Sequence, residues 1–166
     1  MQSRTISERV AMLLPACIFL LTTLIAVSPA PFDWLPIYPH SYLLLICVFT
    51  IYAPHILPIW FVFLSGLLAD IVYAQPFGAH GLCGILLQYV MLSMREQLAN
   101  APFIFIWGAA SILLTIALVL LWGVSRFVTE TDVPIASISW LWLSTLICYP
   151  IWHSVGLRIL RLLPSR

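Results

Sequence analysis

The sequence has no lysine and little charge of any kind. Only 8% of its 166 residues are charged, namely seven arginines and six acidic residues. An average soluble domain carries about 25% charged residues. Hydrophobic residues make up 63% of the chain, and one small soluble core cannot bury that much apolar surface. The net charge of +1 excludes a nucleic-acid-binding domain, and the apolar composition excludes a disordered tail. An integral membrane protein remains.

The few charges divide the chain into long neutral segments. A membrane-spanning helix needs about 20 apolar residues. Most of the neutral segments have the length of one span, but the segment from Leu35 to Ala69 is long enough for two. Pro54 and Pro58 predict a break there, because proline interrupts a helix and disfavours helix just before it. The sequence therefore predicts an all-α protein with a single transmembrane domain over residues 1–166. Its six transmembrane helices are expected at about 10–27, 38–53, 58–74, 80–94, 102–124 and 137–161.

The arginines predict the orientation of these spans. With six spans both termini lie on the same side, together with all arginines except Arg126. Arginine is enriched in cytoplasmic loops, so both termini are expected in the cytoplasm. The outer loops are then residues 28–37, 75–79 and 125–136. The first span is expected to be retained rather than cleaved as a signal peptide, because Pro31 would follow the cleavage site. No loop is long enough for a soluble domain.

The sequence offers few groups for chemistry. Four cysteines and four histidines are scattered without metal-site spacing, so no metal or other cofactor is predicted. Asp70 is the single acidic residue inside a predicted span, where an ionised carboxylate costs about 2.5–3.5 kcal/mol. It is expected to accept backbone N–H groups at the start of the next helix, near Gly78–Gly81, or to contact a partner. An ion or proton pathway is a third interpretation. One carboxylate is too few for intramembrane catalysis, so the chain is not expected to be an enzyme.

Four of the seven glycines lie close together, at Gly66, Gly78, Gly81 and Gly84. The last three recur at intervals of three residues and predict a smooth strip along one helix. Small residues let membrane helices approach closely. The strip is expected either to pack the third and fourth spans together or to form a groove for a partner's helix. Pro150 is expected to kink the last span.

Gly66, Asp70, Gly78 and Tyr89 follow the pattern G-x-x-x-D-x(7)-G-x(10)-Y. This pattern, the chain length and the six-span layout resemble the rod shape-determining protein MreD family. Ala74 departs from that family, in which many members have glycine, and His80 is more polar than expected for it.

The resemblance implies a non-catalytic scaffold in the bacterial inner membrane. MreD-like proteins accompany the single-span protein MreC and help link MreB filaments to the RodA glycosyltransferase and a penicillin-binding transpeptidase. Gly66, Asp70, Gly78, Gly81, Gly84 and Tyr89 are the candidate site residues, for partner binding or for structure. Membrane lipids are expected around the chain, no nucleic acid is expected, and a homodimer is left open.

The resemblance also implies an architecture similar to the substrate-binding subunits of energy-coupling-factor vitamin transporters. Such a subunit is therefore the alternative function. Those subunits often carry A-x-x-x-A in the first span, whereas Ala11 and Ala16 are five residues apart here.

Overall fold

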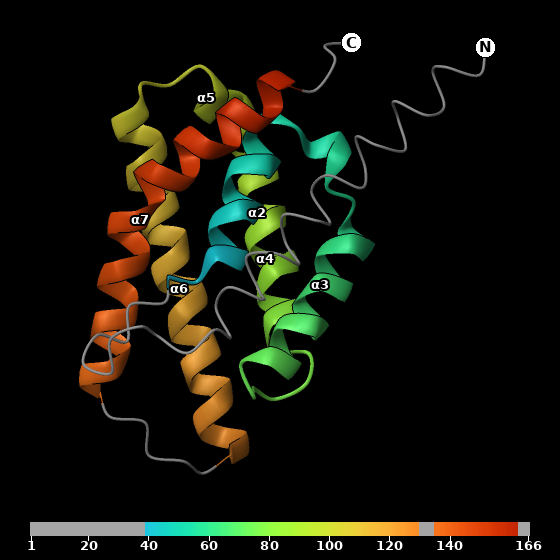
Figure 1. The fold of residues 1–166 in the computed structure, drawn as a ribbon, viewed down its shortest axis with the longest axis vertical. Helices are drawn as coiled ribbons and strands as arrows, with labels where there is room; N and C mark the ends of the chain where they lie inside the picture. The colour runs from blue at the N-terminus through green and yellow to red at the C-terminus, as the bar shows by residue number, and fades with distance from the viewer. Residues whose placement is uncertain (1–38, 130–134, 163–166) are drawn as a thin grey trace, which may run out of the picture.

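The computed structural model describes residues 39–129 and 135–162, and every regular element in these residues is helical (Figure 1). The predicted first span, 10–27, lies outside the described residues. The prediction of an all-α fold is confirmed. The elements are α2 (Ser41–Tyr52), the short 3-10 helix η1 (Pro54–Ile56), α3 (Ile59–Val72), α4 (Ala79–Ser93), α5 (Arg95–Ala99), α6 (Phe103–Thr129) and α7 (Ile135–Leu162).

Helix α2 lies at the centre of the described helices. It packs mainly against α4 and α7, with smaller contacts to α3, α5 and α6. Every residue from Ser41 to Ile51 is buried. A helix that is apolar on all sides is expected in the interior rather than at a surface. Ser41 and Thr50 are the only hydroxyl-bearing aliphatic side chains in this stretch, so no polar face directs α2 outward.

The predicted break between the second and third spans is present. Helix α2 ends at Tyr52, η1 begins at Pro54, and Pro58 directly precedes α3. Proline has no N–H to donate and fits the first positions of a helix, so both prolines lie where the chain changes direction. Helices α2 and α3 have 12 and 14 residues and are shorter than the predicted spans 38–53 and 58–74.

Helices α3 and α4 form an antiparallel hairpin joined by the turn at residues 73–78 (Figure 1). Helix α4 also packs against α2 and α6, so it connects the hairpin to the rest of the molecule. At its far end the chain continues directly into α5, and Pro102 precedes α6.

Helices α6 and α7 are the longest, with 27 and 28 residues. At about 1.5 Å per residue, each is longer than the roughly 30 Å hydrocarbon layer of a bilayer. Within the described residues, Phe103–Val128 is the one stretch both long and apolar enough to cross a membrane, and 33% of its most apolar window is buried. Helix α7 runs through Pro150 without a break, and its axis changes direction along its length (Figure 1).

The helix that contains the predicted fifth span, 102–124, continues beyond residue 124. Helix α6 continues to Thr129, so Ser125, Arg126 and Phe127 belong to the helix rather than to the outer loop 125–136. Arg126 lies in the last turn, where a cation interacts favourably with the helix dipole, and its guanidinium lies 5.6 Å from the centre of the Trp122 ring. The helix therefore includes the charge of Arg126 and does not end before it.

Candidate functional site

The carboxylate of Asp70, near the end of α3, is buried against the start of α4. The backbone N–H groups of Gly78 and His80 donate to Oδ2 and Oδ1 at 2.7 and 2.9 Å. The first turn of a helix has N–H groups without partners inside the helix, and an acceptor there also interacts favourably with the dipole. This is the arrangement expected from the sequence for a structural Asp70, supplied here from a neighbouring helix. A contact between Asp70 and a partner stays a prediction.

The turn between α3 and α4 depends on two residues with positive φ. The N–H of Gln75 donates to the carbonyl oxygen of Asp70 at 2.9 Å, which is the long bond of a Schellman motif at the end of α3. Ala74 has φ +50° and is the one non-glycine residue with positive φ in the described chain. Gly78 has φ +96°, a conformation that suits glycine because it has no Cβ. Gly78 is therefore required by the backbone of the turn.

His80 gives Asp70 a second type of partner. Its Nδ1 lies 2.8 Å from Oδ1 of Asp70, and both side chains are buried. A buried pair at Asp70 was not evident from the sequence, in which His80 is the one basic residue close to it along the chain. Because Nδ1 faces a carboxylate, it is the protonated ring nitrogen and donates. The polarity of His80, unusual for the family pattern, was the signal that could have indicated the pair.

The polar contacts continue from His80 to His40, which directly precedes α2. Their Nε2 atoms are 3.4 Å apart, and the ring of Tyr73 stacks on both histidines at 5.3 Å between ring centroids. The backbone N–H of His40 donates to Oγ1 of Thr145 in α7. We call Asp70, His80, His40 and Tyr73 the Asp70 cluster. Together with Thr145, it connects α2, α3, α4 and α7 at one end of the molecule.

Sequence reasoning missed His40 and Tyr73. Neither residue was among the candidate site residues. The six-span layout itself contained a signal, because residues near 40 and near 73–80 fall on the same predicted side of the membrane. Two histidines and one carboxylate at the same depth are candidates for contact, since buried polar groups need partners.

The glycines form the contact between α3 and α4. A Cβ built on Gly66 would lie 2.4 Å from Cα of Gly81, so the two backbones touch. A Cβ on Gly84 would lie 2.4 Å from the hydroxyl of Tyr42 in α2, which is 2.7 Å from the carbonyl oxygen of Val62. Gly66, Gly81 and Gly84 are all buried. These contacts agree with the internal-packing alternative, and α2, α3 and α4 occupy the space that a partner's helix would need at this strip.

Tyr89 is separate from the other candidate residues. It lies farther along α4 with its side chain 73% exposed. It shares an outward stripe with Leu82 and Leu86, at helical spacings of three and four residues. The outward side of α3 carries a second stripe, Trp60, Leu64, Leu68 and Ile71. We call these seven residues the hairpin stripes.

The Asp70 cluster is buried, and its polar contacts are internal to the fold. Asp70 and His80 are 1% exposed, so neither meets a substrate from solvent. In residues 39–129 and 135–162, no group of three or more histidine, cysteine or acidic residues could hold a metal ion. The hydrogen bonds of the carboxylate join the end of α3 to the start of α4.

The fold and the site define a class: a protein that is helical throughout its described residues, with one helix long and apolar enough to cross a membrane and a buried polar cluster at one end. Within that class, the family model described as rod shape-determining protein MreD matches residues 7–157. Because the match covers nearly the whole chain, the chain belongs to the MreD family, whose role is in rod shape determination. No curated protein and no solved structure matches the chain, so the expected likeness to vitamin-transporter subunits stays a prediction.

Proposed function

We propose that the chain is a non-catalytic scaffold of the bacterial cell-elongation complex. It spans the inner membrane six times as a single domain over residues 1–166, with both termini in the cytoplasm. It binds an MreC-like single-span protein and helps couple MreB filaments to the RodA glycosyltransferase and a penicillin-binding transpeptidase. Membership of a shape-determining family supports this proposal.

The partner surface that we propose is the outward side of the α3–α4 hairpin. The Gly66–Gly81 contact and the bonds of Asp70 hold this hairpin in a fixed shape. Its outward side chains, the hairpin stripes, are large and apolar. A surface with a fixed shape can match a partner's helix closely, and close packing is a main driving force between helices in lipid.

Tyr89 is the observation that favours a partner over lipid alone. Tyr89 is ten residues beyond Ala79, about 15 Å along α4 from its outer end, which corresponds to the middle of the hydrocarbon layer. Its exposed hydroxyl has no hydrogen-bond partner among the described residues, and hydrocarbon offers none. A polar group on a partner's helix would satisfy it.

The test is co-purification of the MreC-like protein with Tyr89→Phe, which removes only the hydroxyl. An interhelical hydrogen bond in a membrane is worth about 0.6–1.7 kcal/mol, so recovery of the partner should fall at least roughly threefold. Leu86→Trp should lower recovery further by steric clash. Leu86 is 54% exposed, and Ile116 on α6 is 51% exposed, so Ile116→Trp is the matched control and should leave recovery unchanged. If the MreC-like protein is recovered equally with all three variants, the partner does not bind the outward side of the hairpin.

A further inference from the structure

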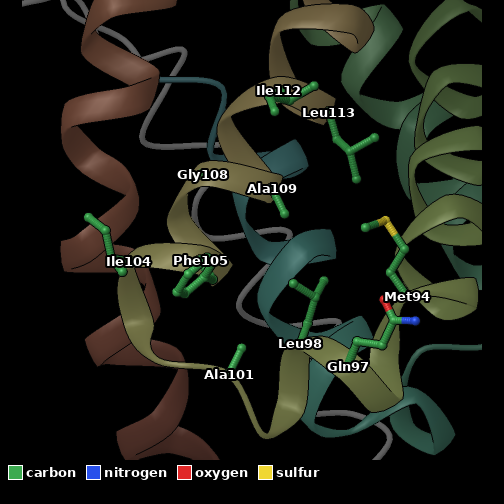
Figure 2. Close-up of a pocket in the computed structure, with 10 residues that line it drawn as sticks. All are labelled: Met94, Gln97, Leu98, Ala101, Ile104, Phe105, Gly108, Ala109, Ile112 and Leu113. Atoms are coloured by element: carbon green, nitrogen blue, oxygen red, sulfur yellow. The ribbon is translucent and has the colours of Figure 1, made fainter.

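A groove opens between the end of the hairpin and α6, away from the Asp70 cluster. Its volume is about 670 Å³, within the range of small-molecule sites. One side is formed by the end of α4 and by α5, and the other by the first turns of α6 (Figure 2). Figure 2 shows Met94, Leu98, Ala109 and Leu113 pointing toward one another across it.

The floor of the groove is open because α6 has small residues there. No heavy atom lies within 4 Å of a Cβ built on Gly108, and Ala109 adds only a methyl group. Phe105 and Ile112 flank Gly108 on the same side of the helix, at spacings of three and four residues. The floor is therefore a shallow channel along the helix axis with bulky apolar residues before and after it.

The length of the groove corresponds to one leaflet of a bilayer. Along α6 it extends from Ile104 to Leu113, which is about 14 Å at roughly 1.5 Å per residue, against about 15 Å for half of the hydrocarbon layer. A partner's transmembrane helix would run along the whole of α6, which has 27 residues. An acyl chain from one leaflet would end where the groove ends.

The polar groups of the groove lie at one end. Gln97 on α5 is the polar side chain that lines it, and the other lining side chains are apolar. In the proposed orientation this end is at the cytoplasmic surface, where a lipid has its ester and phosphate oxygens. The amide of Gln97 can donate to such oxygens, while the apolar walls fit only hydrocarbon.

We infer that this groove holds one acyl chain of a phospholipid from the cytoplasmic leaflet, with the lipid's ester region at Gln97. The inference rests on the membrane position given under the proposed function. Lipid tails are as apolar as leucine, so specificity comes from shape: a tail that fills the channel makes van der Waals contacts that an unfilled groove loses.

The experiment is native mass spectrometry of the full chain released from mild detergent, with lipid extraction from the same samples. Gly108→Phe fills the channel and should lower the bound phospholipid at least fivefold. Gly123→Phe is the matched control, because Gly123 is on the same helix and also has no heavy atom within 4 Å of an added Cβ. It should retain lipid as the unmodified chain does. If Gly108→Phe fails to fold, Ala109→Leu takes its place in the test. Its larger side chain also narrows the channel and should lower the amount of bound lipid.

Absence of bound phospholipid from the unmodified chain, or equal retention by Gly108→Phe and Gly123→Phe, would overturn the inference. Co-purification of the MreC-like protein with the same variants separates this inference from the proposed function. Loss of lipid with the partner retained supports a lipid site. Loss of the partner with lipid retained would make the groove a protein surface, which overturns the lipid site and leaves the scaffold proposal standing.

Discussion

At the scale of single residues, the α3–α4 turn depends on the Asp70 carboxylate. Both of its oxygens accept hydrogen bonds from groups of the next helix. Each donor is buried or partly buried. Removing one partner of a buried bond leaves the other unsatisfied, which costs more than the bond itself contributes.

Asp70→Asn should therefore destabilise the protein by about 2–4 kcal/mol. The asparagine side chain keeps one acceptor oxygen. Its NH₂ group, however, faces a backbone N–H group of Gly78 or His80 that also donates. The measurement is thermal unfolding in detergent, with Glu96→Gln as the control, because Glu96 is exposed and undergoes the same chemical change. If the two variants unfold at the same temperature, the carboxylate is not needed for the turn.

Ala74 is a strained residue in the same turn. Its φ of +50° is a left-handed conformation, which costs an L-residue roughly 1–2 kcal/mol. Ala74→Gly relieves this strain but makes the unfolded chain more flexible, so the net gain should be up to about 1 kcal/mol. The variant should raise the unfolding temperature. Ala109→Gly, inside α6, should lower it because glycine disfavours helix there. A lower unfolding temperature for Ala74→Gly would show that the turn is not strained.

Composition and spacing predicted part of the Asp70 cluster. The cost of a carboxylate inside a membrane identified Asp70, and its distance along the chain from Gly78 indicated the N–H groups that it accepts. The histidine contacts could not be predicted in the same way. His40 and His80 are 40 residues apart, and only the packing of α2 against α4 brings their rings together.

At the scale of helices, small residues decide how closely α3 and α4 approach. The Cβ position of Gly66 is occupied by the backbone of Gly81, which cannot move aside as a flexible side chain could. Overpacking in a tight interface costs about 1–3 kcal/mol and sometimes more.

Gly66→Ala should accordingly lower the free energy of unfolding by at least about 2 kcal/mol, since backbone atoms clash. Gly108→Ala is the matched control, because its Cβ enters open space and alanine favours helix. Unfolding in detergent, followed by circular dichroism, measures both. Equal stability of the two variants would mean that α3 and α4 can separate without loss.

Helix lengths were less predictable than helix positions. The neutral segment from Leu35 to Ala69 and the prolines at 54 and 58 were enough to place α2 and to separate it from α3. Arg126 was misleading because a charge was taken to end a span, whereas the observed helix carries it in its last turn. A long basic side chain can extend toward the polar surface while its backbone stays helical.

At the scale of the whole molecule, the charged residues specify an orientation. Arg95 and Glu96 lie on α5, and Arg126 lies in the last turn of α6. Helix α5 and the end of α6 are at opposite ends of the molecule (Figure 1). Helix α6 separates these ends by about 40 Å at roughly 1.5 Å per residue, which is more than the hydrocarbon layer. The two ends should therefore face opposite sides of the membrane.

Cysteine labelling tests this orientation directly. The four native cysteines are replaced, and Phe127→Cys or Glu96→Cys is introduced singly, since Phe127 is 89% exposed and Glu96 is also exposed. A membrane-impermeant maleimide should label Phe127→Cys in intact spheroplasts and Glu96→Cys only after lysis, because arginine-rich segments stay in the cytoplasm. The reverse pattern would invert the proposed topology and place the Asp70 cluster on the cytoplasmic side. Labelling of both positions in intact spheroplasts would mean that α6 does not cross the membrane.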